Sequence, residues 1–446
     1  MPRVYPFRAL QYTTGRDLSS VVAPPYDVLD VAAKTRLVER SAANIVSVDL
    51  PHVPPKELGP AASYAKAAET YGSWIEEGVL GRRAVPAIFA YRQTFAFEGG
   101  THQRCGMFAT VDAAPFGPRA GGGILPHEET FSGPKEDRLA LMTATRAQLS
   151  PIFGLHSDES GAATKLVRSV MQARQPDFTA RMDYDGVLHE LWAVEDPDTI
   201  AAYERALAGE DIFIADGHHR YNTQLNYIKQ LESQGALPAD HPARKCMMVL
   251  IGMSDPGLVI GPTHRVLGGM KQYSLEAFKK ASSGLLSFTP VAGDLEALNA
   301  SLKATSGSEV CLGLHDVASR SGYLIRPVEA DPLAKAFGRK PEAWRKLDVA
   351  VIQHLVVEQI CQPHLNAGEP VKWAFPHSVP EVAQIAQGAE TGAGGGKGFV
   401  AQMALLVRPT PLKAVRDVSR ANELMPQKST FFYPKLATGL CINPLA

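Results

Sequence analysis

Residues 211–223 constrain the fold of this chain more than any other stretch. The apolar run Ile212–Ala215 predicts a buried strand, and Asp216-Gly217 ends it. Apolar side chains between Tyr221 and Leu231 then recur at helical spacing and predict a helix with one buried face. A strand followed at once by such a helix is typical of proteins in which helices pack on a sheet. Together with the strands and helices described below, it predicts an α/β protein with mixed sheets.

Between the predicted strand and helix stands the sequence Asp-Gly-His-His-Arg, residues 216–220. The N-terminus of a helix offers backbone N–H groups and the positive end of the helix dipole, which suit a phosphate or another anion. Gly217 allows the backbone to approach a ligand closely, and the Arg220 guanidinium holds phosphate oxygens with two N–H groups. The alternative is an ordinary capped helix, in which Asp216 accepts hydrogen bonds from the first N–H groups. The two histidines, the arginine and the carboxylate together favour a site.

A second predicted helix start carries residues of the same kind. Ser132 and Pro134 predict an N-terminus, with a helix from about Lys135 to Gln148. Carboxylates beside a helix N-terminus suit Mg²⁺ and phosphate together, whereas the alternative is a solvated, capped loop. The charged and polar side chains gathered here are His127, Glu128, Glu129, Thr130, Lys135 and Arg138.

Two further segments carry candidate residues. The proline-rich loop at residues 21–30 presents Tyr26 and Asp27, which either face a ligand or form a structural turn before a helix. Thr263-His264-Arg265 follows a predicted return strand. If that strand pairs beside the strand before Asp216, His264 and Arg265 point into the same cleft.

Other stretches predict regular structure without chemistry. Residues 44–50 alternate like a strand, and residues 61–80 form an amphipathic helix with an aromatic stripe. Residues 87–97 and 104–111 predict a hairpin. These segments extend the α/β pattern to both sides of the candidate site.

Two segments near the C-terminus resemble functional loops. The glycine-rich residues 390–398 lack the Walker motif, because Lys397 is followed by Gly398, and they predict a flexible hairpin loop. Residues 425–435 place lysines and hydroxyl groups among aromatic side chains. This tail either closes over a site or anchors the end of the chain.

Charge and composition exclude several classes of protein. Lys plus Arg total 45 against 46 for Asp plus Glu, so the chain has no electrostatic footprint for nucleic acid or an anionic membrane. Residues 1–7 lack the apolar core of a secretory signal, and five scattered cysteines fit reduced thiols. We therefore expect a cytoplasmic protein, with three regions at residues 1–120, 121–270 and 271–446.

Five blocks of the sequence carry a resemblance to a known family. Taken in order, they resemble the family catalogued as domain of unknown function 1015, and the resemblance runs from Pro6 to Pro444. The blocks are residues 23–28, 126–135, 215–221, 262–265 and 425–430.

The turn at residues 216–220 is also similar to the phosphate-binding turn of the ParB/sulfiredoxin-like fold, above all in free-serine kinases. That resemblance implies a nucleotide-binding core of this fold within residues 121–270, flanked by additional α/β regions. It also implies that Asp216 is a catalytic carboxylate. The phosphate cradle would consist of Gly217, His218, His219 and Arg220.

The resemblance and the residue chemistry together predict a kinase that uses ATP or ADP with Mg²⁺ and phosphorylates a small hydroxyl metabolite, above all free L-serine. Asp216, Glu128 or Glu129 would act as base, and Asp216 and Glu128 as metal ligands. The additional phosphate-binding residues would be Lys135, Arg138, Thr263, His264 and Arg265. The residues that bind the acceptor would be Tyr26, Asp27 and His127.

Two other functions fit the same residues. The first is a non-catalytic or regulatory nucleotide-binding protein that uses the same cradle. The second is a metal-dependent phosphohydrolase, whose ligands would be His127, Glu128, His218 and His219. Association into a homo-oligomer is compatible with each of these functions.

Overall fold

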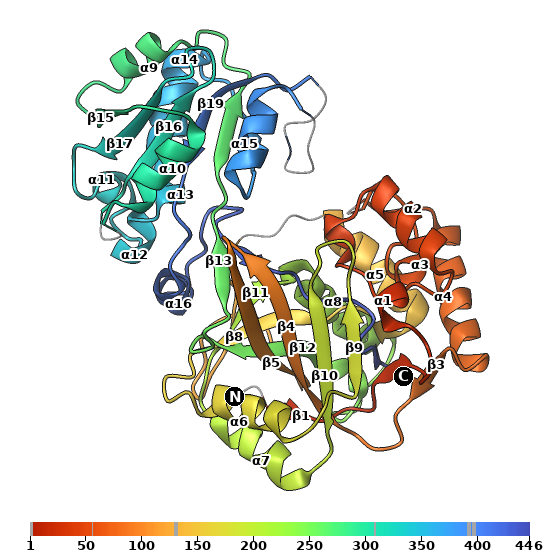
Figure 1. The fold of residues 1–446 in the computed structure, drawn as a ribbon. Helices are drawn as coiled ribbons and strands as arrows, with labels where there is room; N and C mark the ends of the chain where they lie inside the picture. Colours follow the sequence, from red (N-terminus) through yellow and green to blue (C-terminus); the bar gives the residue numbers. More distant parts are fainter. Residues whose placement is uncertain (1–2, 56, 129–132, 307–308, 390–393, 395–397) are drawn as a thin grey trace. The chain divides into compact units, whose positions relative to one another are not determined.

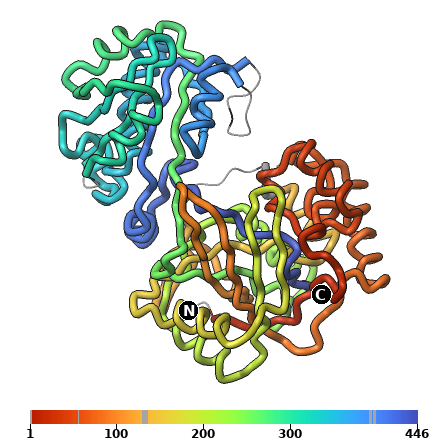
Figure 2. The backbone as a smooth tube through the Cα atoms, in the orientation of Figure 1, coloured from red at the N-terminus to blue at the C-terminus, as the bar shows by residue number. Residues whose placement is uncertain are grey.

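The computed structural model describes residues 3–446 apart from 56, 129–132, 307–308, 390–393 and 395–397. The chain forms two compact units, each described by itself (Figure 1). Unit 1 comprises Met1–Pro126, Thr130–Val259 and Pro434–Ala446, and unit 2 comprises His127–Glu129 and Ile260–Tyr433. In Figure 2 the tube can be followed out of unit 1 and, at its blue end, back into it. Unit 2 is therefore inserted into unit 1.

A mixed sheet forms the centre of unit 1. β11 runs parallel to β6 and antiparallel to β8, so both kinds of pairing occur in it. The strand order along the sheet is β6 (Ile124–Leu125), β11 (Ile212–Asp216), β8 (Ile152–His156), β12 (Lys245–Gly252), β5 (Gly100–Asp112), β4 (Ile88–Phe97), β10 (Leu188–Val194) and β9 (Phe178–Arg181), with β1 (Val4–Tyr5) paired to β5.

The central strands of this sheet are apolar because both of their faces are covered. β12 is buried from Cys246 to Gly252, as expected for a strand in the middle of a sheet with helices on it. On one face α6 (Ala162–Ala173) and α7 (Pro197–Ala206) contribute Val167, Tyr203 and their neighbours to the core (Figure 1).

A helical region of unit 1 packs beside this sheet, around a separate hydrophobic core. α4 buries Tyr64, Ala67, Tyr71 and Trp74 in it, which confirms the predicted amphipathic helix. The elements of the region are β2 (Leu10–Tyr12), α1 (Leu18–Val21), η1 (Tyr26–Val28), α2 (Val31–Arg40), α3 (Val46–Asp49), α4 (Ala61–Glu76), β3 (Leu80–Arg82) and α5 (Gly133–Thr145).

The strand predicted at residues 44–50 is wrong, because this segment contains the short helix α3. The Asn44 side chain accepts a hydrogen bond from the Val46 N–H at 3.0 Å and donates to the carbonyl of Ser20 at 2.8 Å. An asparagine that satisfies the backbone in this way favours a helical turn over a strand.

The C-terminal residues complete unit 1. Leu10 and Ile442 exchange backbone hydrogen bonds of 2.9 and 3.0 Å, and β21 (Asn443–Pro444) pairs with β7 (Ala147–Gln148). Between β11 and β12 lie α8 (His218–Gln234) and the short η2 (Pro242–Arg244).

Unit 2 contains a six-stranded sheet whose strand pairings are all antiparallel. Alternate residues face opposite sides, so Leu405 and Leu406 of β19 belong to different hydrophobic cores. The order is β15 (Leu286–Val291), β17 (Gly322–Pro327), β16 (Leu312–Asp316), β19 (Ala401–Leu406), β14 (Arg265–Gly268) and β18 (Lys372–Ala374).

Helices cover both faces of this second sheet. α10 (Leu295–Lys303) and α15 (Val379–Ala386) pack on one face. The other face carries α9 (Leu275–Ala281), α11 (Ala334–Phe337), α12 (Glu342–Arg345), α13 (Asp348–Val351), η3 (Ile352–Cys361), α14 (Gln362–Leu365) and α16 (Leu412–Arg420). A separate two-stranded ribbon joins β13 (Val259–Gly261) to β20 (Phe431–Tyr433).

The prediction of an α/β protein with mixed sheets is confirmed. The units divide the chain differently from the predicted boundaries at residues 120 and 270, because β1, β4 and β5 share a sheet with β8, β11 and β12. The predicted return strand before Thr263 corresponds to β13, which pairs with β20, whereas β11 pairs with β6 and β8. The pairing on which a shared position of His264 and Arg265 with Asp216 depended is therefore not formed by these strands. Most of the loop predicted at residues 390–398 lies outside the described residues.

The lengths of the helices and the state of the cysteines bear on the class of protein. Within this part of the chain, every helix is too short or too polar to cross a membrane. The five cysteines are buried thiols without disulfide bonds, as expected from their scattered positions.

Candidate functional site

The turn between β11 and α8 has the predicted form. Residues 212–215 are buried, whereas residues 216–220 are partly exposed at the start of the helix. Gly217 adopts a φ of 96°, in the left-handed region that favours glycine. A Cβ atom there would lie 3.1 Å from Cζ of Arg220, so the folded-back guanidinium also requires glycine. The backbone is therefore open to a ligand at the N-terminus of a 17-residue helix.

Two cations hold the Asp216 carboxylate. Arg220 Nη2 donates to Asp216 Oδ2, and Lys435 Nζ donates to Asp216 Oδ1. The three side chains are only 10%, 17% and 23% exposed for Arg220, Asp216 and Lys435. Burial acts to raise the pKa of Asp216, but Lys435 and Arg220 hold it well below its usual range. The carboxylate is thus ionised at physiological pH and lies between two cations beside the helix N-terminus.

Lys435 is held in place through its backbone by buried polar side chains. Arg104 Nη2 donates to the Pro434 carbonyl at 2.5 Å, and Gln93 Nε2 donates to the Lys435 carbonyl at 2.9 Å. The Arg104 guanidinium itself lies 4.6 Å from the centre of the Phe153 ring, and its burial lowers its pKa to about 10. Lys435 is a member of this cluster that was not predicted; its only signal in the sequence is a lysine within an aromatic-rich tail.

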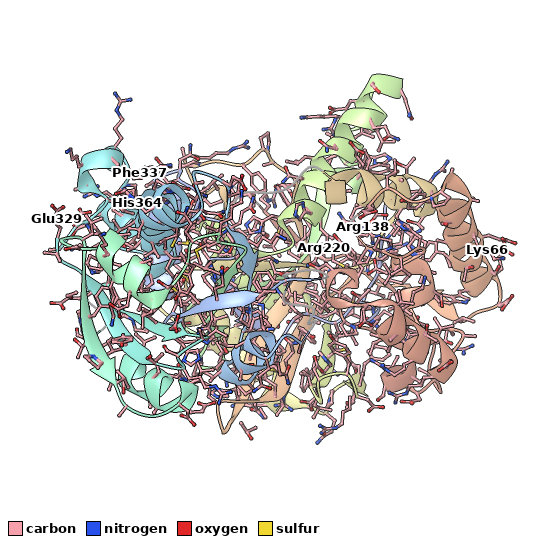
Figure 3. The ribbon with its side chains drawn as sticks, turned by 90° about the horizontal axis from the view of Figure 1, so that it is seen from above. Lys66, Arg138, Arg220, Glu329, Phe337 and His364 are labelled. Carbon is pink, nitrogen blue, oxygen red and sulfur yellow. The ribbon has the colours of Figure 1, made fainter. Side chains whose placement is uncertain are left out.

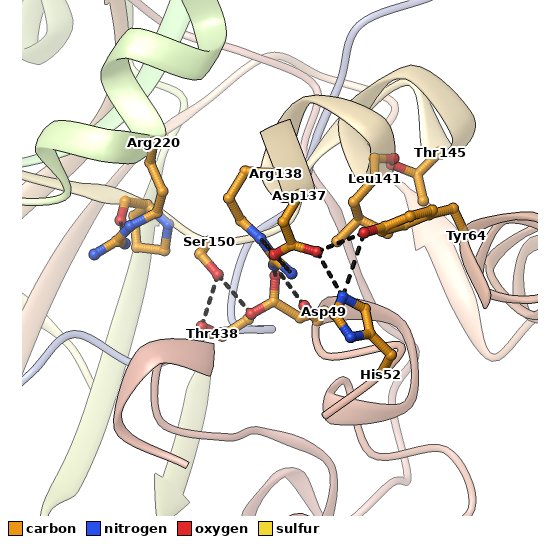
Figure 4. A network of polar contacts seen from close by, with 11 residues as sticks. Asp49, His52, Tyr64, Asp137, Arg138, Leu141, Thr145, Ser150, Arg220 and Thr438 are labelled. Atoms are coloured by element: carbon orange, nitrogen blue, oxygen red, sulfur yellow. Dashed lines mark hydrogen bonds and ion pairs between the residues drawn. The ribbon is translucent and has the colours of Figure 1, made fainter. Parts of the chain in front are cut away.

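Arg138 lies in the interior of unit 1 with its partners around it (Figure 4). Its Nη1 donates to the Asp49 carbonyl at 2.6 Å, its Nε donates to Asp137 Oδ2 at 2.8 Å, and its guanidinium lies 3.9 Å above the Tyr26 ring. Tyr64 in turn donates to Asp137 Oδ1 at 2.8 Å. The contacts of Arg138 are therefore those of a residue that joins α5 to α3 and η1.

Asp49 connects the contacts of Arg138 to a second group of polar side chains, Ser150 and Thr438. Ser150 Oγ donates to Asp49 Oδ2 at 3.1 Å and lies 2.9 Å from Thr438 Oγ1. Burial raises the pKa of Asp49, against the effect of Arg138. A cavity of about 40 Å³, close to the size of one or two water molecules, is bordered by side chains from the contacts of Arg138 and by Arg220. They include Tyr26, Asp49, Arg138, Ser150 and Arg220 (Figures 3 and 4).

Tyr26 and Asp27 are neighbours in the short helix η1. Among the described residues, Asp27 Oδ1 is buried without a hydrogen-bond partner. Burial lowers the pKa of Arg220, but nearby Asp216, Asp27 and Tyr26 raise it, with a net increase. The carboxylate of Asp27 therefore faces the same cationic group as that of Asp216.

The other predicted blocks meet in unit 2. His127 Nε2 lies 2.7 Å from Thr430 Oγ1, and Glu128 Oε1 accepts a hydrogen bond from the Thr430 N–H at 2.9 Å. The Met425 N–H donates to the His127 carbonyl at 2.7 Å. Glu129 and Thr130 lie outside the described residues, as does the side chain of Lys135.

Thr263, His264 and Arg265 are buried in unit 2. His264 Nδ1 accepts a hydrogen bond from the Val407 N–H at 3.1 Å, and burial lowers the pKa of His264 to about 3. The His264 ring is therefore neutral at physiological pH. Thr263 Oγ1 lies 3.3 Å from His377 Nδ1.

The five sequence blocks thus gather into two groups. Residues 23–28 and 215–221 meet in unit 1 together with Lys435. Residues 127–128, 262–265 and 425–430 meet in unit 2. The described residues contain no group of three or more His, Cys, Asp or Glu side chains that could hold a metal ion. Mg²⁺ is commonly bound by one or two carboxylates and the phosphates of a substrate, whereas both oxygens of Asp216 are already paired with Arg220 and Lys435, so Asp216 does not fit such an ion in this arrangement.

Several solved structures are similar to this chain at low identity. A free serine kinase variant in complex with AMP is 10% identical, with a TM-score of 0.33, over 69% of this chain and 83% of that one. A variant in complex with ADP is 11% identical, with a TM-score of 0.32, over 71% and 89%. SbnI from Staphylococcus aureus with a C-terminal truncation is 11% identical, with a TM-score of 0.32, over 72% and 84%.

Comparison with sequences identifies a family but no characterised relative. No curated protein matches this chain. The model of the family described as "Protein of unknown function (DUF1015)" matches residues 4–350, which is more than half of the sequence. The chain belongs to the DUF1015 family.

Proposed function

We propose that this protein binds a nucleotide at residues 216–220 and transfers a phosphoryl group from ATP to the hydroxyl group of a small metabolite, with free L-serine as the first candidate. The observation that carries the proposal is the arrangement of Arg220 and Lys435 around Asp216 at the N-terminus of α8. Phosphoryl transfer is catalysed mainly by positioning and by positive charge around the phosphates, which this arrangement supplies.

The phosphates would bind where cations and backbone dipole coincide. The first backbone N–H groups of an α-helix have no acceptor within the helix, and at this end of α8 the Arg220 guanidinium packs over Gly217. Arg220 uses Nη1 for the Pro151 carbonyl and Nη2 for Asp216, and Lys435 has three ammonium hydrogens. Arg220 would therefore keep N–H groups for a phosphate oxygen while it holds the carboxylate, and the Lys435 ammonium would add positive charge beside it.

In the proposed reaction, the bond between the γ-phosphorus and the oxygen that bridges it to the β-phosphate breaks. A new bond forms from the γ-phosphorus to the acceptor oxygen, so the products are ADP and the phosphorylated metabolite. The hydroxyl proton leaves to the Asp216 carboxylate. Because its pKa is so low, Asp216 is a weak base and acts mainly by orienting the acceptor. Mg²⁺ carried by the nucleotide phosphates would supply further neutralisation of phosphate charge.

Asp27 gives a reason to consider an amino acid as the acceptor. Its buried Oδ1 lacks a hydrogen-bond partner among the described residues, and its charge acts on Arg220. A buried carboxylate oxygen in this state favours a cationic group such as the ammonium of serine. The choice of serine itself rests on the resemblance of residues 216–220 to the turn of free-serine kinases.

The test is to incubate the full chain with ATP, Mg²⁺ and L-serine and to follow O-phospho-L-serine by ³¹P NMR. We expect turnover to fall by about 100-fold or more in Asp216→Asn, the range for loss of a positioned acid or base. The control is Asp198→Asn, an exposed carboxylate in the first turn of another helix, which should leave turnover unchanged. Failure of the unmodified chain to bind ATP would overturn the proposal.

The second candidate is a protein that binds a nucleotide without catalysis. The observation in its favour is that both carboxylate oxygens of Asp216 are already engaged by cations, which makes it a weak base. Binding of ATP without turnover across a panel of amino acids and small alcohols would select this function. Loss of ATP without any acceptor would instead assign hydrolysis.

A further inference from the structure

Unit 2 contains a cavity of about 480 Å³ that the proposed function does not use. Its volume falls within the usual range for sites that bind small molecules. The residues that matter for its chemistry are the aromatic and polar side chains that border it. They include Arg265, Phe337, Trp344, His354, Trp373 and Phe375.

Aromatic rings form two separate parts of the cavity wall. Phe337, Trp344 and His354 form one cluster, with ring centroids 4.5 to 5.3 Å apart (Phe337 is labelled in Figure 3). Trp373 and Phe375 form the other, with centroids 5.9 Å apart and planes inclined by only 5°. Flat aromatic surfaces of this kind favour contact with a planar ring.

The cavity is also bordered by a buried cation without a carboxylate partner. Arg265 Nη1 donates to the Thr263 carbonyl, Nη2 donates to the Lys428 carbonyl at 3.0 Å, and the guanidinium lies 5.1 Å from the Phe375 ring centre. Over the described ranges, no carboxylate forms an ion pair with it. Burial lowers the pKa of Arg265 to about 10, with a smaller opposing effect of Glu128. A buried charge whose direct partners are carbonyl groups and an aromatic ring favours an anion in the adjacent space.

One wall of the cavity is built from an uncommon helix. η3 is a π-helix of 10 residues, and past its end the Gln362 N–H still bonds to the Val357 carbonyl, five residues earlier. π-helical turns are rare and occur mostly at functional sites. Glu358 accepts a hydrogen bond from Gln353 Nε2 at 2.6 Å and lies 2.8 Å from His354 Nδ1. The wider helix thus presents three mutually held polar side chains to the cavity.

We propose that this cavity binds a small planar aromatic molecule that carries one anionic group. The ring lies against the aromatic walls, and the anionic group lies at the guanidinium of Arg265. This site is separate in sequence and in chemistry from the proposed phosphate site, since none of its residues belongs to unit 1.

The test uses indole-3-acetate, indole-3-acetamide and acetate as probes of the full chain in isothermal titration calorimetry. We expect the carboxylate probe to bind about 10-fold or more tighter than its amide, because a hydrogen bond to a charged group is worth about 1.5–3 kcal/mol. Acetate alone should show no measurable binding. Equal affinity for the acid and the amide, or no binding of the acid, would overturn the proposal.

Substitutions then locate the site. Trp373 is only partly buried, so Trp373→Ala should preserve the fold and weaken indole-3-acetate at least several-fold. Arg265→Gln should remove the preference for the acid over the amide, and circular dichroism checks that it folds. The matched control for charge is Arg339→Gln, which is exposed and outside the cavity.

Asp216→Asn should leave the binding of indole-3-acetate unchanged, which separates a failure of this proposal from a failure of the kinase proposal. Unaltered affinity in Trp373→Ala would contradict the site.

Discussion

Arg220 in unit 1 and Arg265 in unit 2 are both buried cations at the edge of a cavity, but their charges are compensated differently. Burial acts to lower the pKa of each guanidinium. At Arg220 the nearby carboxylates, above all Asp216, reverse that effect and the pKa rises. At Arg265 the close partners are carbonyl groups and an aromatic ring, and the pKa falls to about 10.

This difference shows what each region requires from a ligand. In the Asp216 cluster, the chain itself supplies a carboxylate that pairs directly with both cations. Among the described residues no carboxylate forms an ion pair with Arg265, so the proposed ligand would supply the anionic group in direct contact with it. A buried charge near a cavity is thus informative only when its compensating groups are known.

The largest expected effect comes from removing the Asp216 carboxylate. Asp216→Ala leaves Arg220 and Lys435 buried without their carboxylate, so we expect the free energy of unfolding to fall by about 3 kcal/mol. Arg265→Met breaks no ion pair and should cost about 1–2 kcal/mol for its lost hydrogen bonds. Urea unfolding followed by circular dichroism measures both. Equal losses would show that the two arginines are compensated alike.

The second prediction concerns pH. The folded-state pKa of His264, about 3, lies below its ordinary value of 6.5, so the unfolded chain binds a proton first as pH falls. The folded state therefore loses stability below pH 6.5. His264→Asn keeps an acceptor for Val407 but cannot titrate, and it should reduce the loss between pH 7 and pH 4.5 by about 2 kcal/mol.

For Asp216 we expect no change in its contribution to the unfolding free energy over most of this pH range. Its pKa is depressed, so its contribution is present above the unfolded pKa and is lost only as pH falls toward the folded value. The difference in unfolding free energy between the unmodified chain and Asp216→Asn should stay constant from pH 7 to pH 5. A difference that changes over this range would contradict the assigned ion pairs.

The third prediction tests the geometry of the turn. Gly217→Ala places a Cβ 3.1 Å from the Arg220 guanidinium at a positive φ, so it should cost about 1–2 kcal/mol and weaken ATP binding. Gly235, at the other end of α8, has an extended φ of 160° and open space around it. Gly235→Ala is the control and should change neither quantity appreciably.

The smallest expected effects come from removing one hydroxyl group in each unit. Ser150 donates to Asp49, and Thr430 donates to Glu128, at the same distance of 3.1 Å. Ser150→Ala and Thr430→Val should each lower the free energy of unfolding by about 1 kcal/mol. Thermal unfolding of the two variants checks this, and a loss several times larger at one site would show that its network is coupled over more groups than the hydrogen bond itself.

Local features of the fold were predictable where the sequence pattern was strong. The strand, turn and helix at residues 212–234 follow from an apolar run, a glycine and helical spacing, and the structure confirms them. Residues 44–50 were mistaken for a strand, because alternation over so few residues does not exclude a helical turn capped by Asn44.

The composition of the candidate site was less predictable, because it depends on contacts between distant residues. Lys435 meets Asp216 from 219 positions away, and local spacing carries no signal of such a pair. Arg138 belongs to a charged stretch that resembles a solvated loop, yet its partners lie in α3 and η1. Charge and spacing alone do not distinguish an arginine that binds a ligand from one that joins helices.

The insertion of unit 2 has a consequence for synthesis on the ribosome. Asp216 and Arg220 are made early, but Lys435 and its neighbours follow only after residues 260–433 have been translated. Domains generally fold as units, from the N-terminus onward, during translation. A nascent chain that ends within unit 2 therefore has Arg220 beside Asp216 without the ammonium group, and Leu10 without its partner Ile442. The cluster of Asp216, Arg220 and Lys435 in unit 1 is completed only after the whole of unit 2 has been made.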